Sequence, residues 1–276
     1  LAITDHGAMY GVIDFYKACQ KAGIKPIIGC EVYVAPYSRF DKRANIDDSP
    51  YHLVLLAKDN RGYQNLIKLV SLAHLEGFYY KPRVDREILA QFSEGLIALS
   101  GCLAGEIASY LLQDNWEKAK EAALWYQETF GEGNFYLELQ NQGLHEQAQL
   151  NSQLAELGRE TGIPLVATND VHYVGAEDAR MQDVLMCIQM GKILEDDSRM
   201  RFESNQFYLK SWEEMNLALG EYQDALENTL KIAQQCNVEF TFGKNHMPVF
   251  QVPQGHTVET YLEQLCMEGL KKRYGN

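Results

Sequence analysis

The chain has 276 residues, of which 46% are hydrophobic and 23% charged, and its formal net charge is −13. This composition excludes a disordered chain and a basic module that grips duplex DNA through its phosphates. The six cysteines form no CxxC pair and no apolar run is long enough to span a membrane, so we expect a cytoplasmic protein without a disulfide framework.

Short apolar runs alternate with longer amphipathic stretches through most of the chain. Strands are predicted at residues 1–4, 26–34, 52–57, 96–100, 135–140 and 165–168. Helices are predicted between them at residues 9–22, 61–76, 116–130 and 145–160. This alternation favours an α/β layer or barrel with largely parallel strands.

After about residue 175 the pattern changes. The remaining predictions are a helix over 177–191, an irregular polar stretch over 193–206, a helix over 222–236, a short strand over 238–242, a connector over 246–257 and a helix over 258–274. Thr257 can cap the last helix, and its basic C-terminal turn suits the helix dipole. That helix has little to pack against here, so we expect it to belong to a following domain.

The first polar group, Thr4-Asp5-His6-Gly7, comes where the first strand ends. In α/β barrels such positions face the active site, and imidazole and carboxylate groups bind zinc or manganese. Asp5 either supports such a site or merely caps the helix that follows. Glu31 is an ionisable group within an apolar strand, so it needs a buried partner such as a metal unless it points to solvent.

Further ligand-type residues lie at other strand ends. His52 begins a predicted strand, where a histidine is more often structural. Cys102 follows a strand, and is a zinc ligand, a nucleophile without an evident partner, or a small packing residue. Asp170 and His172 are two residues apart, which on an extended segment points both to one side. The remaining histidines, expected to be ordinary core or surface residues, are His74, His145, His246 and His256.

Several motifs carry a resemblance to one family. In chain order they are LAITDHG (1–7), FYKAC (15–19), GIKPIIGCEVYV (23–34), SGCLAGE (100–106), TNDVHY (168–173), ALENT (225–229), IAQQCNV (232–238) and EGLKKRY (268–274). The chain resembles the PHP region of bacterial DNA polymerase III alpha subunits along essentially its whole length.

The resemblance implies a fold and a domain division. The fold is a distorted, seven-stranded, TIM-like (β/α) barrel followed by a mainly helical segment. Residues 1–180 would form the PHP barrel, 181–245 its helical remainder, and 246–276 the connector and first helix of the polymerase palm. The family's first strand, with a His-x-His pair, is expected upstream of Leu1, and the polymerase aspartates beyond Asn276. The chain would then be truncated at both ends, with an open barrel edge and weak or no hydrolysis of its own.

The resemblance also implies a metal site. Position by position, the ligands of up to three zinc, manganese or magnesium ions would be His6, Glu31, His52, Cys102, Asp170 and His172, with Asp5 beside them. This implies a metal-dependent phosphoesterase, and specifically a 3′–5′ proofreading exonuclease, within a DNA-directed DNA polymerase of chromosomal replication. Expected partners are DNA, the sliding clamp, the clamp loader and a separate exonuclease, in the bacterial cytoplasm at the replisome.

Two alternatives remain. The region is a catalytically silent scaffold that stabilises the polymerase core and docks a separate exonuclease subunit. Otherwise it is a free-standing hydrolase of small phosphoesters, such as a histidinol-phosphate phosphatase. The connector and the last helix argue against the second alternative, because a complete phosphatase needs neither.

Overall fold

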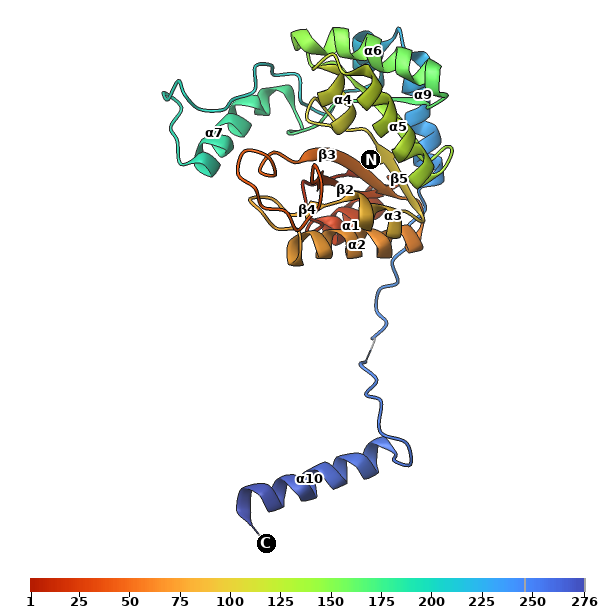
Figure 1. The fold of residues 1–276 in the computed structure, drawn as a ribbon, viewed down its shortest axis with the longest axis vertical. Helices are drawn as coiled ribbons and strands as arrows, with labels where there is room; N and C mark the ends of the chain where they lie inside the picture. Colours follow the sequence, from red (N-terminus) through yellow and green to blue (C-terminus); the bar gives the residue numbers. More distant parts are fainter. Residues whose placement is uncertain (246, 276) are drawn as a thin grey trace. The chain divides into compact units, whose positions relative to one another are not determined.

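The computed structural model describes residues 1–245 and 247–275, and it divides the chain into Leu1–Glu239 and Phe240–Asn276. The first unit is a mixed α/β structure in which helices cover a sheet (Figure 1). The second unit contains α10 (Val258–Tyr274), whose N-cap Thr257 accepts a hydrogen bond from the Thr260 amide, as predicted. The predicted connector includes His246, which lies outside the described residues.

The sheet of the first unit has seven strands in the order β1-β2-β3-β5-β6-β7, with β4 also paired to β2. They are β1 (Ala2–Ile3), β2 (Ile27–Val34), β3 (Tyr51–Ala57), β4 (Arg83–Val84), β5 (Leu96–Leu99), β6 (Phe135–Gln140) and β7 (Leu165–Thr168). All predicted strands up to residue 168 are present, within two residues of their expected bounds. Sequence reasoning missed β4 because two residues carry no periodic pattern.

The direction of β3 departs from the predicted parallel arrangement. It runs antiparallel to both β2 and β5, whereas the remaining strand pairs are parallel. The loop over 35–50 between β2 and β3 contains no helix, so the chain turns back instead of crossing over the sheet. The start of β3 therefore lies at the edge where β2 ends, with His52 opposite Tyr33.

The sheet curls into part of a barrel. Its two end strands, β1 and β7, both line one cavity of about 610 Å³, together with side chains of the middle strands. A buried apolar cluster extends from this cavity, formed by Ile27, Val54, Leu56, Ile97, Leu99, Tyr136, Val166, Ile232 and Cys236. The helix α9 (Gln223–Gln235) packs against β7 and contributes Ile232 to this apolar cluster.

The longer helices agree with their predictions within a few residues. They are α1 (Val12–Ala22), α2 (Asn60–Leu75), α5 (Trp116–Phe130), α6 (His145–Thr161), α7 (Ala179–Met190), α9 and α10. The helices that were not predicted are α3 (Arg86–Gln91), α4 (Glu106–Leu111) and α8 (Trp212–Leu219), and the predicted helix over 177–191 begins as a 3₁₀ turn, Ala176–Asp178. Elements this short carry too little periodicity to detect.

The strand predicted over 238–242 is wrong, since residues 238–242 form neither strand nor helix. Two hydrogen bonds tie the backbone here to the junction of β3 and α2 instead. The Asn237 amide donates to the Lys58 carbonyl, and the Glu239 amide donates to the Asn60 side chain. An apolar pattern without a neighbouring strand therefore stays irregular. Among the helices of the described residues, none combines the length and apolarity that crossing a membrane requires.

Candidate metal centre

The first candidate ligand is positioned by the pairing of β1 with β2. The Glu31 amide donates to the Asp5 carbonyl at 3.1 Å, and the Gly7 amide to the Glu31 carbonyl at 2.9 Å. These bonds hold His6 beside Glu31. Gly7 then turns the chain away in a left-handed conformation (φ +62°), where a Cβ would lie 2.7 Å from Pro82 Cγ. Glycine is required at this position.

Glu31 is the centre of a group of three ligand-type residues. It is 6% exposed, and its Oε1 lies 2.6 Å from His52 Nδ1 and 3.3 Å from His6 Nε2. One ligand atom from each residue lies within 4.8 Å of those of the other two. Burial by itself would raise the pKa of Glu31, but the bonds from His52 and His6 lower it to about 2. Glu31 is therefore a carboxylate at neutral pH, and its hydrogen bond with His6 raises the pKa of that histidine.

Cys102 joins this group from the turn after β5. Its Sγ lies 3.9 Å from His52 Nδ1. The preceding Gly101 has φ +83°, and a Cβ there would lie 2.7 Å from the His52 carbonyl oxygen, so glycine permits the close approach. Burial raises the pKa of the Cys102 thiol. The sulfur is therefore protonated unless a cation displaces the proton.

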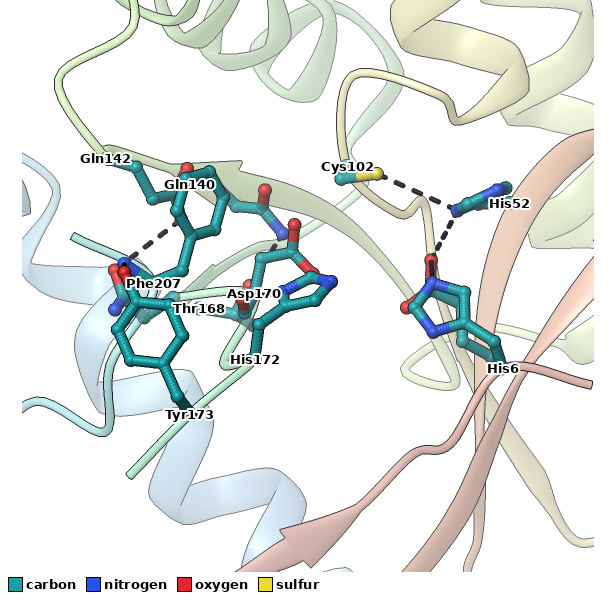
Figure 2. Close-up of polar contacts among 12 residues, drawn as sticks. His6, His52, Cys102, Gln140, Gln142, Thr168, Asp170, His172, Tyr173 and Phe207 are labelled. Carbon is teal, nitrogen blue, oxygen red and sulfur yellow. Dashed lines mark hydrogen bonds and ion pairs between the residues drawn. The ribbon is translucent and has the colours of Figure 1, made fainter. Parts of the chain in front are cut away.

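Asp170 and His172 face this group from the segment after β7 (Figure 2). The His172 ring centroid lies 6.0 Å from that of His6. His172 Nδ1 donates to the Asp170 carbonyl at 2.7 Å, so Nε2 remains available as a ligand. The expectation of an extended segment is wrong, because Asp170 adopts a left-handed conformation with φ 47°. The two side chains nevertheless stay close, with Asp170 Oδ1 3.8 Å from His172 Nδ1.

The candidate ligands converge on one cavity, which is lined by His6, Glu31, Cys102, Asp170 and His172, with His52 in contact through Glu31. Imidazole, carboxylate and thiol donors suit zinc, and the nitrogen and oxygen donors also suit manganese. The donor set therefore fits a divalent metal ion. The role of each residue as a ligand stays a prediction.

The supporting residues named from the sequence have mixed outcomes. Asp5 lines the same cavity and does not cap α1, whose N-cap Gly11 has no side-chain cap. His74 lies outside the donor group, with Nε2 2.9 Å from the Gly7 carbonyl oxygen. His145 begins α6, and the His256 ring contacts Tyr261 in the second unit. His246 falls outside the described residues.

Sequence reasoning missed Glu138, a buried carboxylate of β6 that lines the cavity. It accepts hydrogen bonds from the Gly101 amide, the Thr168 hydroxyl and the Gln140 side chain. Glu138 thus links the turn that carries Cys102 to the strand that precedes Asp170. The signal was available, because Glu138 is an ionisable residue in an apolar strand, as Glu31 is.

Glu138 predicts a pH dependence of stability. Burial is the largest influence on this carboxyl group and raises its pKa from 4.5 to about 7 in the metal-free protein. A raised acid pKa means that the folded state binds the proton more tightly, so stability falls as the pH rises from about 4.5 to about 7 and then levels off. Urea unfolding in EDTA across this range should show a shallower slope for Glu138→Gln. Identical slopes for the two proteins would contradict the assignment.

The comparisons with known proteins give the family. The model of the PHP domain matches residues 1–142 of the 276. The chain belongs to the PHP family. The matched PHP residues include four of the candidate ligands and end after β6, before Asp170 and His172. The curled, mixed sheet is compatible with the distorted barrel of the PHP type.

Three relatives of this PHP chain carry the same name, DNA polymerase III subunit alpha. The chain is 47% identical over 279 residues to the subunit of Borreliella burgdorferi, and the match covers 100% of the chain and 24% of that protein. The subunit of Treponema pallidum is 47% identical, with 99% and 24% covered. The subunit of Thermus aquaticus is 46% identical, with 99% and 23% covered. The PHP chain therefore spans about a quarter of the length of these relatives.

Proposed function

We propose that this PHP chain is part of a bacterial DNA polymerase III alpha subunit, a DNA-directed DNA polymerase, and that its site is a metal-dependent phosphoesterase with 3′–5′ exonuclease activity. The observation that carries this proposal is the convergence of the His6, Glu31 and His52 donors at one edge of a PHP-type sheet. The proposed division is a barrel over 1–180, a helical remainder over 181–245, and a connector with the first palm helix over 246–276.

Zinc, manganese or magnesium, up to three ions, is proposed as the cofactor. The residues that would hold it are His6, Glu31, His52, Cys102, Asp170 and His172. When bound, such cations acidify water and neutralise charge on a phosphoryl group. The chain's own contribution is orientation: the Glu31 carboxylate fixes two imidazoles, and the His172 Nδ1 bond to the Asp170 carbonyl turns Nε2 to the site.

The proposed partners follow from the relatives' name. They are DNA, the sliding clamp, the clamp loader and a proofreading exonuclease, at the replisome in the cytoplasm. The net charge of −13 argues that duplex DNA is gripped elsewhere in the longer polypeptide.

The decisive experiment follows nucleotide release from a mismatched primer by the full-length polypeptide, with manganese or zinc added after EDTA treatment. His172→Ala should abolish release, because it removes a donor from the site. The exposed His145, at the start of α6, offers a matched control, and His145→Ala should retain full activity. Release that is unchanged by His172→Ala refutes the phosphoesterase proposal.

The scaffold alternative is favoured by one surface. Met181, Leu185 and Ile188 form an apolar stripe on α7 and are 62%, 59% and 72% exposed. Such a stripe suits contact with another protein surface. Bound metal without hydrolysis, combined with retained affinity for an exonuclease subunit, would decide for this alternative.

A further inference from the structure

The turn over residues 78–82 lies at the rim of the candidate metal centre, between α2 and β4. Pro82 packs against Gly7, because a Cβ added to Gly7 would lie 2.7 Å from Pro82 Cγ. The Lys81 amine lies 5.4 Å from the centroid of the Tyr33 ring. That ring contacts the rings of His6 and His52, with centroids 6.0 and 5.1 Å away. The Tyr33 ring therefore lies between the Lys81 amine and the imidazole rings of His6 and His52.

The tip of this turn displays an aromatic ring. Tyr79 and Lys81 exchange two backbone hydrogen bonds, of 3.0 and 2.7 Å, which leaves Tyr80 between them. Tyr80 has φ 56° and is 71% exposed. A non-glycine residue is strained in this conformation and persists only where the surrounding structure imposes it. The Tyr80 ring contacts the Tyr79 ring edge-on, with centroids 4.7 Å apart, and most of its surface stays open to solvent.

Arg83 makes the turn part of a rigid rim. Its guanidinium is 0% exposed and donates to the Gly77 carbonyl on one side of the turn. On the other side it donates to carbonyls of the loop over 35–50, namely those of Asp47, Arg39 and Asp41. The turn and the loop are thus held together beside the site.

The charges around the site favour an anion at Lys81. No ion pair joins Lys81 to a carboxylate within residues 1–245 and 247–275. The cavity lining in this described part contains Asp5, Glu31, Glu138 and Asp170 but neither lysine nor arginine. A cationic side chain at the rim lowers the repulsion that an anionic substrate meets as it approaches these carboxylates.

We propose that residues 78–82 bind the end of a single-stranded nucleic acid, with Lys81 Nζ on a backbone phosphate and the Tyr80 ring stacked on a base. Stacking on an exposed ring requires an unpaired base, which selects single strands over duplexes. This inference rests on the proposed function, because it takes the metal centre as the place where the phosphodiester is cut.

The test maps where a strand end lies on the full-length polypeptide. An oligothymidylate with a 3′-terminal 5-iododeoxyuridine is photocrosslinked in EDTA, so that no hydrolysis is needed. Mass spectrometry should locate the crosslink at Tyr80. Lys81→Ala should lower its yield about 5–10-fold at moderate salt, and Tyr80→Gly should remove it.

Two controls separate binding from folding. Lys68 also holds its amine 5.4 Å from an aromatic centroid, that of Phe92, and Lys68→Ala should leave the yield unchanged. Tyr80→Gly relieves the positive φ, so its urea midpoint should not fall below that of the wild type. The lack of any crosslink within residues 78–82, or equal yields there for Lys81→Ala and Lys68→Ala, overturns the proposal even where nucleotide release is found.

Discussion

Glu31→Gln is expected to weaken divalent metal binding by about 100-fold or more, a larger loss than changes to residues that only support ligands produce. The carboxylate is the shared partner of His6 and His52, so the amide removes a donor and the charge that orients both rings. Competition with a chromogenic zinc chelator measures the affinity.

The same variant should destabilise the metal-free protein. The pKa of Glu31 falls from 4.5 to about 2 on folding, so its stabilisation is present above pH 4.5 and disappears as the pH falls to about 2. A shift of this size corresponds to roughly 3 kcal/mol at neutral pH. Urea unfolding in EDTA should therefore separate the two proteins at pH 7 and less so at pH 3.

Glu106 provides the matched control for Glu31. It is equally buried, at 6% exposed, but pairs with Arg86 and Tyr126 away from the donor group. Glu106→Gln should lower stability and leave zinc affinity intact. Equal zinc affinities for Glu31→Gln and Glu106→Gln would remove Glu31 from the proposed ligand set.

Arg83→Met is expected to cost roughly 3–5 kcal/mol of folding stability, because several carbonyl oxygens lose their hydrogen-bond donor, at about 1–3 kcal/mol for each one left buried and unsatisfied. Methionine fills part of the space but leaves the carbonyls of Gly77, Arg39, Asp41 and Asp47 without their donor. Chemical denaturation measures the loss. Hydrogen exchange should also quicken in the loop over 35–50, because that loop loses its anchor.

Arg61 offers the comparison for Arg83. Its pair with Glu94 is largely exposed, with side chains 60% and 73% accessible, so Arg61→Met should cost less than about 1 kcal/mol. If Arg83→Met costs no more than Arg61→Met, the buried network does not hold the rim.

Local patterns predicted much of the fold. The bounds of α5, β6, β7 and α10 agree with their predicted ranges, because each has a clear apolar period or a strong cap. The same reasoning failed over 238–242, where an apolar pattern has no strand to pair with. It also missed α3 and α4, which are shorter than two helical turns.

The sequence by itself determined which chemical groups are present and that most of them follow a strand, since both properties are local. Only the tertiary structure decided which groups meet. Because β3 is antiparallel, His52 reaches the edge where Glu31 lies even though His52 is near the start of its strand. The order of β5, β6 and β7 places Glu138 between Cys102 and Asp170. Strand order and direction depend on contacts between distant segments, which the periodicity of a single segment does not encode.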